Sequence, residues 1–389
     1  MDTLLVIALT SLAAWCVLLF GRNGFWRADQ RPGTPSPLPH WPTVAIIIPA
    51  RNEKDSIGDV VHAHLKTHYC GARRLYVVDD GSEDDTAAIA RRAMAQADFP
   101  ATVLDAPPLE AGWSGKLAAI AAGIAQAESD EAPDYFLLTD ADILHSPGTL
   151  STLVSQAVTG QLSLVSLMAR LDARGFWGEL LIPAFVYFFQ KLYPFPGVNN
   201  PKSPIAAAAG GCMLVEANAL KEAGGIGEIR SALIDDCALA ALLKTRRRRR
   251  RIWLGLAQTQ VVSLRDNRSL SSIWDMVART AYAELEFSPV KLIGAVTGML
   301  LVYITPVATA LIGLMEGHGL LTIISLATLG GMFISYGPTL RLYEQSTKRA
   351  IALPLVAIFY TLMTLSSAWR HWHGKGGQWK GRTYPGGIY

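Results

Sequence analysis

The sequence is poor in cysteine, and its four cysteines show no metal-binding pattern. Cys16, Cys70, Cys212 and Cys237 lack the short spacings that are typical of a metal site. Cys16 lies within an apolar run, and we expect the region that holds the others to be cytosolic. Because disulfides are rare in that compartment, we expect a fold that forms without them.

The chain also lacks a strong excess of charge of either sign. Its 35 Lys and Arg residues and 32 Asp and Glu residues give a net charge of +3. This balance argues neither for nor against nucleic-acid binding. Six arginines form one run, Arg246–Arg251, without the interleaved aromatics or the module of a nucleic-acid-binding protein. Attraction to anionic lipid headgroups and plain solvation both explain the run, and we expect no nucleic-acid partner.

Apolar residues, in contrast, are abundant and unevenly spread. Half of the 389 residues are hydrophobic, and the mean hydropathy is positive. As a helix, Thr3–Phe20 would span about 27 Å, close to the hydrocarbon thickness of a bilayer. Three more runs lie near the C-terminus: Leu292–Met315, Leu320–Tyr336 and Ala350–Ala368. The pattern predicts one N-terminal and about three C-terminal transmembrane helices.

The first apolar run lacks the marks of a cleaved signal peptide. It has no basic n-region, and no A-x-A site precedes Gly21, so we expect an uncleaved anchor. Arg22 and Arg27 follow directly, which favours a cytoplasmic location for the chain beyond them. Three C-terminal spans would put the tail outside, whereas its basic residues favour the inside. The side of the tail therefore stays open.

The region between the membrane segments has the pattern of an α/β domain. Arg31–Pro42 contains five prolines and reads as an extended linker. From Val44 to about Leu264, short apolar strands alternate with helical stretches, which is typical of a mainly parallel sheet. We expect these domains: an anchor (1–21), a Pro-rich linker (22–42), an α/β domain (43–285), a C-terminal transmembrane region (286–369) and a basic, aromatic tail (370–389).

Three predicted strands end in polar residues. The first runs into Pro49-Ala50-Arg51-Asn52-Glu53, the second into Asp79-Asp80-Gly81-Ser82, and the third, Tyr135–Leu138, is followed by Asp140-Ala141-Asp142. Ligands of open parallel sheets bind beyond the carboxyl ends of the strands. We therefore expect these segments to form one site at one edge of the sheet.

The T-D-A-D segment predicts a cation site. Residues two apart on an extended backbone point to the same side, so Asp140 and Asp142 can face one hard cation such as Mg²⁺ or Mn²⁺. The metal would hold a diphosphate, with help from Lys116 and from backbone N–H groups at a helix start. Asp79 and Asp80 suit the N–H groups of a base or the hydroxyls of a ribose. A D-x-D alone occurs in many loops, so the prediction depends on all three strand ends.

Taken together, the motifs resemble those of the family 2 glycosyltransferases, whose GT-A fold binds nucleotide-diphospho-sugars. They occur in the family's order over roughly residues 43–285: P-A-R-N-E (49–53), V-V-D-D-G-S-E-D-D-T (77–86), G-K-L-A (115–118), T-D-A-D (139–142), G-G-C-M (210–213) and D-D (235–236). More narrowly, the anchor, the C-terminal spans and the ending W-K-G-R-T-Y-P-G-G (379–387) resemble the hopene-associated glycosyltransferases. Those are bacterial membrane proteins linked to hopanoid lipid synthesis.

The resemblance implies a role for each matching residue. It assigns eight residues to the nucleotide-sugar donor: Ala50, Arg51, Glu53, Asp79, Asp80, Lys116, Asp140 and Arg279. Asp140 and Asp142 match the metal-binding carboxylates, and Gly210-Gly211-Cys212 matches the turn that lines the acceptor side. The implied cofactor is Mg²⁺ or Mn²⁺.

Asp236 matches the family's catalytic base, and Asp235 stands beside it where the family more often has Glu. A carboxylate within hydrogen-bond reach can take the proton of the acceptor hydroxyl. A single base on the face opposite the leaving group gives inversion at the sugar. Repulsion from Asp235 would raise the pKa of Asp236, although a purely structural role for Asp235 is the alternative.

One departure from the family concerns processivity. Its polymer synthases carry Q-x-x-R-W after the base, whereas Met276–Thr280 keeps only Arg279, as a diphosphate contact or an interfacial arginine. We therefore expect a hexosyltransferase that moves one sugar from a UDP-sugar to a lipid or isoprenoid acceptor. We expect it in the bacterial cytoplasmic membrane, with the catalytic domain in the cytosol. A processive polysaccharide synthase and a non-enzymatic membrane scaffold are the alternatives.

The segment Leu180–Phe189 is strongly apolar but too short to cross a bilayer. A core helix is one interpretation. The other is an amphipathic segment that lies on the membrane and guides a lipid acceptor toward Asp236. The aromatic residues beside Lys191 favour the second interpretation.

Overall fold

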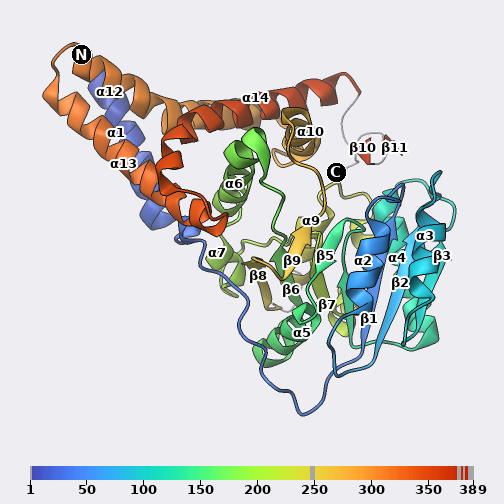
Figure 1. Ribbon diagram of the computed structural model, residues 1–389. Coiled ribbons are helices and arrows are strands. Elements are labelled where there is room, and N and C mark those ends of the chain that lie inside the picture. Colours follow the sequence, from blue (N-terminus) through green and yellow to red (C-terminus); the bar gives the residue numbers. More distant parts are fainter. Residues whose placement is uncertain (1, 246–249, 375–377, 380–381, 384–389) are drawn as a thin grey trace. The chain divides into compact units, whose positions relative to one another are not determined.

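The computed structural model describes residues 2–245, 250–374, 378–379 and 382–383. Its α/β part is built around a seven-stranded sheet. Its strands lie in this order: β3 (Ala101–Asp105), β2 (Arg73–Asp79), β1 (Val44–Ala50), β4 (Tyr135–Leu138), β7 (Met213–Glu216), β6 (Leu164–Met168) and β8 (Ile252–Leu256). β7 is antiparallel to both of its neighbours, and the other neighbouring pairs are parallel. The predicted mainly parallel α/β sheet is confirmed (Figure 1).

The register of the sheet brings three strand ends to one edge. Ala50 at the end of β1 pairs with Asp79 at the end of β2, and Ile47 pairs with Leu138 of β4. The polar segments that follow these strands therefore begin at the same edge, as the sequence predicts.

Helices cover both faces of this sheet, and their bounds are α2 (Ile57–Leu65), α3 (Thr86–Met94), α4 (Gly115–Asp130), α5 (Thr149–Gly160), α8 (Ala217–Glu222) and α9 (Asp235–Thr245). All seven residues of β1 are buried. Ile46 shares a core cluster with Val60 of α2, whereas Ile47 points to the opposite face. There, a Cβ added to Gly123 of α4 would lie only 2.7 Å from the Ile47 side chain. Burial on both faces explains why these strands read as continuous apolar runs.

Two small antiparallel pairs accompany the main sheet. β5 (Ile143–His145) pairs with β9 (Val261–Ser263), and β10 (Gln378–Trp379) pairs with β11 (Arg382–Thr383). β5 begins directly after Asp142, so the first pair fixes the segment that carries the D-x-D motif.

The remaining elements are helices, and their bounds are α1 (Asp2–Cys16), α6 (Gly175–Leu192), α7 (Phe195–Asn199), α10 (Leu270–Thr280), α11 (Pro289–Met299), α12 (Thr305–Met315), α13 (Gly319–Leu342) and α14 (Leu353–Trp372). π-Helical turns occur at Val17–Gly21, after α1, and at Leu300–Ile304, between α11 and α12. Short 3₁₀ helices cover Phe25–Arg27, Ile226–Ile229 and Thr347–Ala352.

Among the described residues, four helical segments are long and apolar enough to cross a membrane: Asp2–Gly21, Pro289–Met315, Gly319–Leu342 and Thr347–Trp372. One is N-terminal and three are C-terminal, as the sequence predicts. Large apolar side chains stay exposed on them, for example Val6, Leu311 and Ile334. Such a surface suits contact with lipid hydrocarbon.

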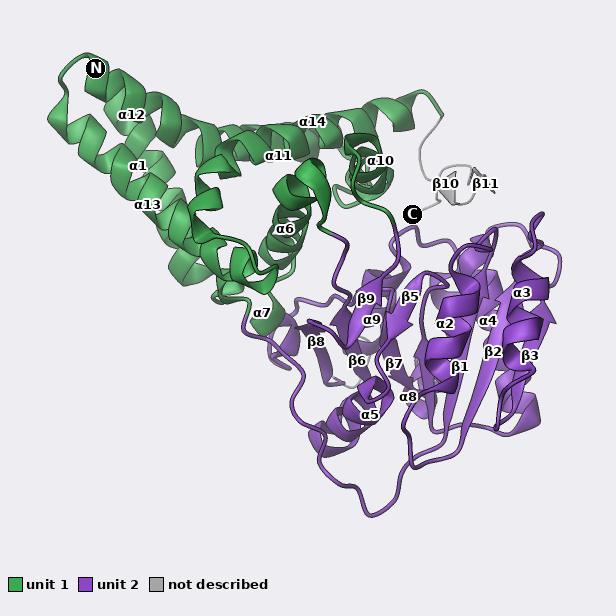
Figure 2. Ribbon diagram, viewed as in Figure 1, with its two compact units in different colours: residues 1–28, 173–196, 266–377 green, residues 29–172, 197–265, 378–389 purple. Residues whose placement is uncertain are grey.

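The chain divides into two compact units, each built from separate stretches (Figure 2). The sheet unit comprises residues 29–172, 197–265 and 378–389, and the helical unit comprises residues 1–28, 173–196 and 266–377. Residues 173–196 and 266–285 belong to the helical unit, although the expected α/β domain (43–285) includes them. α6 and α10 lie in these stretches.

The apolar segment Leu180–Phe189 lies within α6, a packed helix of the helical unit. Leu181 and Tyr187 are fully buried. The Tyr187 and Ser335 hydroxyls lie 2.8 Å apart, and the Tyr360 hydroxyl donates to the Leu181 carbonyl at 2.9 Å. These contacts with α13 and α14 support the core-helix interpretation and correct the preference for a helix that lies free on the membrane surface.

Candidate active site

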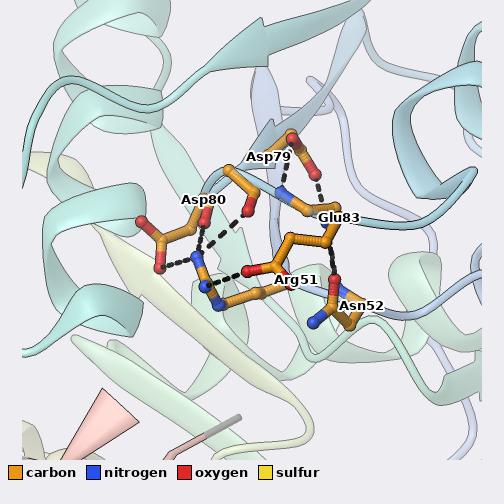
Figure 3. Close-up of polar contacts among 7 residues, drawn as sticks. Arg51, Asn52, Asp79, Asp80 and Glu83 are labelled. Atoms are coloured by element: carbon orange, nitrogen blue, oxygen red, sulfur yellow. Dashed lines mark hydrogen bonds and ion pairs between the residues drawn. The ribbon is translucent and has the colours of Figure 1, made fainter. Parts of the chain in front are cut away.

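Arg51 joins the loops that follow β1 and β2. Its guanidinium donates to the carbonyls of Asp80 and Gly81, the latter at 3.1 Å (Figure 3). It also lies 3.9 Å from the Asp80 carboxylate and 3.6 Å from that of Glu83. Only 11% of the Arg51 side chain is exposed, so this arginine holds the two loops together.

The loop after β2 is fixed by short-range hydrogen bonds. The Asp79 carboxylate accepts both the N–H and the hydroxyl of Ser82. Asn52, which has a positive φ of 52°, accepts the Glu83 N–H at 2.8 Å and donates its own N–H to Ser82 Oγ at 2.9 Å. Asp79 and Asp80 are buried. The predicted nucleoside-binding segments therefore form one rigid double loop at the sheet edge.

The remaining donor-side residues of these loops are also held in place. Ala50 is buried at the end of β1, and its carbonyl accepts the Asp80 N–H at 2.8 Å. The Glu53 N–H donates to Thr86 Oγ1 at 2.8 Å, at the start of α3.

Lys116 lies between two acids that come from distant parts of the sequence. Its Nζ is 2.8 Å from Asp140 Oδ1 and 3.1 Å from Asp235 Oδ2. The first turn of α4 that carries it is capped by Ser114, which accepts the Leu117 N–H at 3.2 Å. Burial alone would lower the pKa of Lys116, but the charges of Asp140, Asp235 and Asp236 outweigh burial and raise it. Lys116 is therefore a permanent cation at this edge.

Asp236 is held by two backbone amides at the start of α9. The Gly210 N–H donates to Oδ2 and the Cys237 N–H donates to Oδ1, each at 2.8 Å. A Cβ on Gly210 would lie 3.3 Å from Lys116 Nζ and 3.5 Å from Asp236 Oδ2, so a glycine leaves room here. Burial and then the charge of Asp235 raise the pKa of Asp236 to about 7, against the opposing effects of Lys116 and the two amides. A carboxyl group with such a pKa can accept a proton near neutral pH.

A buried bridge connects the D-x-D segment to the glycine turn. The Thr139 hydroxyl donates to the Gly211 carbonyl at 2.8 Å and lies 2.9 Å from His145 Nε2. Because the hydroxyl has one proton, His145 Nε2 must donate to Thr139. The His145 ring packs on His64 with centroids 4.8 Å apart, and burial lowers the pKa of His145 to about 4. His145 is thus a neutral positioning group, and no sequence motif indicated it.

The carboxylates available to a metal are few. Within the described ranges, no group of three or more His, Cys, Asp or Glu residues is arranged around a common metal position. The predicted metal ligands are therefore the two carboxylates of Asp140 and Asp142. The Asp142 backbone is fixed by its carbonyl, which accepts the Leu264 N–H at 2.8 Å. Mg²⁺ is commonly bound by one or two carboxylates together with substrate phosphates and water. The donor set fits a metal ion that binds together with a diphosphate.

The structure brings most of the predicted residues together within the sheet unit. Lys116, Asp140, Asp235, Asp236 and Gly210 form one contact cluster. Gly211 contacts the cluster through Thr139, and the Cys212 side chain is fully buried. Arg279 is different, because it lies on α10 in the helical unit.

Comparisons with known proteins agree with this architecture. Residues 45–224 match the family described as Glycosyl transferase family 2. Among solved structures, the chain is similar to "Mannosyltransferase PcManGT from Pyrobaculum calidifontis in complex with GDP-Man and Mn2+". That match has 18% identity and a TM-score of 0.56 and covers 95% of this chain and 99% of that chain.

A more distant similarity is to glucosyl-3-phosphoglycerate synthase from Mycobacterium tuberculosis in complex with uridine-diphosphate. It has 21% identity and a TM-score of 0.41, and it covers 66% of this chain and 87% of that chain. No curated protein sequence matches the chain.

Proposed function

We propose the reaction of this glycosyltransferase from its match to glycosyl transferase family 2 over residues 45–224 and from its GT-A fold. It moves one sugar from a UDP-sugar to a lipid or isoprenoid acceptor, with inversion and with the help of Mg²⁺ or Mn²⁺. The observation that carries the proposal is the position of Asp236. Two backbone amides aim its carboxylate, and Lys116 neutralises the acids around it.

Asp236 acts as the base in this reaction. The acceptor hydroxyl gives its proton to the Asp236 carboxylate as its oxygen attacks the anomeric carbon, and the diphosphate leaves from the opposite side. A pKa raised to about 7 suits this role, since the carboxylate is both present and basic near neutral pH. Asp235 supports the role, because its charge raises the pKa of Asp236 and its own carboxylate pairs with Lys116.

The donor binds across the carboxyl edge of β1, β2 and β4. The double loop with Arg51, Asp79 and Asp80 takes the nucleoside, with Ala50 and Glu53 at its start, and Lys116 faces the diphosphate. Asp140 and Asp142 would hold the metal ion, and its chemical contribution would be to stabilise negative charge on the leaving diphosphate. The role of Arg279, which lies on α10 of the helical unit, stays a prediction from the family resemblance. The similar mannosyltransferase binds GDP-Man, so a guanine nucleotide is the donor to test beside UDP.

The acceptor reaches the site from the membrane. The four apolar helices support a membrane-bound enzyme, and the turn Gly210-Gly211-Cys212 would face the acceptor. We assign the sheet unit to the cytosol because Arg22 and Arg27 follow the first apolar helix. The assignment to the bacterial cytoplasmic membrane comes from the resemblance to the hopene-associated glycosyltransferases. The ending at 379–387 favours a hopanoid acceptor, and most of that motif lies outside the described residues.

A mass-spectrometric transfer assay tests the proposal. Detergent-solubilised protein is incubated with Mg²⁺ or Mn²⁺, with UDP- and GDP-sugars, and with lipid extracts from a bacterium that makes hopanoids and from a mutant that does not. We expect one lipid to gain a single hexose mass with the wild type and not with Asp236→Asn. NMR of the product should show the anomeric configuration inverted relative to the donor.

Other outcomes support the alternatives. A ladder of products with many sugars would favour a processive synthase over single transfer. The absence of both product and nucleotide binding would favour a scaffold. A product that forms equally from both extracts would remove the hopanoid assignment and leave lipid transfer standing.

A further inference from the structure

Two basic side chains lie together in the helical unit. Arg22 follows the π-helical turn Val17–Gly21, and Lys191 lies in the last turn of α6. Arg22 Nε donates to the Lys191 carbonyl at 3.2 Å, and its Nη2 donates to the Leu192 carbonyl at 2.9 Å. Within the described parts of the chain, no ion pair joins either side chain to a carboxylate.

Aromatic residues surround the Lys191 ammonium. Its Nζ lies 4.7 Å from the centre of the Tyr303 ring and 5.0 Å from that of Phe188. It donates to the Tyr303 hydroxyl at 3.1 Å, and Met299 Sδ, a weak acceptor, is 3.9 Å away. Phe188, Met299 and Tyr303 thus form a cage around the ammonium. Because an ammonium has three N–H donors and the cage accepts two, one N–H is left to bind an anion.

The cage is a fixed structure. Tyr303 belongs to the π-helical turn Leu300–Ile304, and such turns are frequent at functional sites. The Trp15 indole N–H donates to the Val302 carbonyl at 2.7 Å, and its ring meets Tyr303 edge-on with centroids 5.7 Å apart. Tyr303 is fully buried. The hydroxyl that faces Lys191 is therefore held in position without a ligand.

The charges of this site are not balanced. Burial first, and then the charge of Arg22, lower the pKa of Lys191 to about 8, so the ammonium is still mostly charged at pH 7. A buried ammonium beside a second cation costs free energy unless an anion compensates its charge. An anion placed between Arg22 and Lys191 would remove this cost.

The surroundings favour an anion that carries a lipid chain. Arg22 comes directly after the apolar helix Asp2–Gly21, where a spanning helix would reach the level of the phosphates. Apolar neighbours of both basic residues are exposed: Phe20 is 82% exposed and Leu192 is 44% exposed. A basic site bordered by exposed apolar side chains matches a phosphate attached to acyl or prenyl chains.

We propose that Arg22 and Lys191 bind the phosphate group of an anionic membrane lipid, with the Lys191 ammonium held by the buried Tyr303 hydroxyl. The two cations compensate the phosphate charge, and the Tyr303 hydroxyl holds the ammonium in place by accepting one of its N–H groups. The site lies wholly within the helical unit, and its occupancy does not depend on Asp236 or on sugar transfer. Its failure would therefore leave the proposed reaction untouched, and the reverse also holds.

Thermal unfolding of the full chain in an uncharged detergent tests this site. The additives are phosphatidylglycerol, phosphatidylcholine, diacylglycerol and inorganic phosphate at equal concentration. We expect phosphatidylglycerol to raise the unfolding temperature by about 2–4 °C, and the other three additives to have little effect. Lys191→Met, which keeps the side-chain length, should abolish that rise. Lys348→Met removes an exposed lysine of the same unit and should keep it.

Each alternative result has a defined meaning. If Lys191→Met keeps the full rise, or if Lys348→Met loses it equally, the site is overturned. An equal rise with inorganic phosphate would overturn the requirement for a lipid. If Lys191→Met does not fold, as judged by circular dichroism, Tyr303→Phe and Arg22→Gln decide the question. A full rise in both of these variants overturns the proposal, and a reduced rise in either supports it.

Discussion

The backbone N–H of Gly210 donates to Asp236 Oδ2 at 2.8 Å, which joins the turn before β7 to the first turn of α9. The two residues are distant in sequence, and neither motif alone indicates the contact. This hydrogen bond orients the Asp236 carboxylate through a backbone N–H group, which does not depend on the side chain at position 210. The orientation of the proposed base is thus a property of the backbone.

We predict that Asp236→Asn abolishes transfer and preserves donor binding. The amide keeps the shape of the carboxylate but cannot accept the acceptor proton, so kcat should fall by about 10²–10⁴-fold. Radiolabelled transfer gives kcat, and calorimetry with UDP and Mn²⁺ gives donor affinity. Asp266→Asn, at an exposed aspartate, is the control. Retained turnover in Asp236→Asn would exclude this residue as the base.

The activity should depend on the ionisation of Asp236. Its pKa is raised to about 7, so the charged, basic form increases as the pH rises through that value, and kcat/KM should fall about tenfold per pH unit well below it. Asp235→Asn removes the repulsion and should move this limb to lower pH. The measurement is kcat/KM from pH 5 to 9 for both proteins. An unchanged limb in Asp235→Asn would show that Asp235 does not set the pKa of the base.

Gly210→Ala should lower activity more than stability. The added Cβ would sit 3.3 Å from Lys116 Nζ and 3.5 Å from Asp236 Oδ2, and the flexible end of a lysine can move away. We expect a normal unfolding midpoint and a reduced kcat, because the Lys116 ammonium must shift. Gly148→Ala is the matched control, since nothing lies within 4 Å of its added Cβ. Equal activity of both variants would mean that the Lys116 position is unimportant.

Thr139→Val should destabilise the sheet unit. The substitution keeps the shape but removes the acceptor of the His145 N–H and the donor to the Gly211 carbonyl. Leaving a buried polar group without its partner costs about 1–3 kcal/mol. Denaturant unfolding of Thr139→Val and Thr139→Ser measures the effect, and serine should restore most of the loss. If valine is as stable as serine, the bridge does not contribute.

Asp142→Ala should weaken metal-dependent nucleotide binding. The proposed metal has only Asp140 and Asp142 as candidate protein ligands, so the loss of one removes a large part of its coordination. We expect UDP affinity in Mn²⁺ to fall toward the value that the wild type shows in EDTA. Glu316→Ala, at an exposed glutamate of the helical unit, serves as control. An affinity equal to that of the wild type would remove Asp142 from the metal site.

Local patterns were sufficient to predict the ends of β1, β2 and β4. Each is a short apolar run followed by polar residues, and parallel strands necessarily bring such ends together. The contact of Lys116 with both Asp140 and Asp235 could not be read from any spacing, because three segments meet there only after folding. The contact between the buried His64 and His145 rings could not be predicted for the same reason.

The helical unit shows a different limit of sequence reasoning. The four long apolar runs were found by length and composition alone. The sequence of α6 does not distinguish its two interpretations, because an apolar, aromatic segment of its length suits either a membrane surface or a protein core. Contacts with residues far along the chain, such as Ser335 and Tyr360, decide between them.

The reversed direction of β7 separates the tasks of the two rims of the sheet. Leu138 at the end of β4 pairs with Met213 at the start of β7, so the glycine turn enters the sheet from the rim where β1, β2 and β4 finish. Every proposed reacting group of the sheet unit is thereby concentrated on one rim. The opposite rim carries none of these proposed reacting groups. There, Thr43 donates to the Asp134 carboxylate and joins the starts of β1 and β4. We therefore expect a reporter or a fused domain inserted in a loop on that rim to leave the chemistry undisturbed.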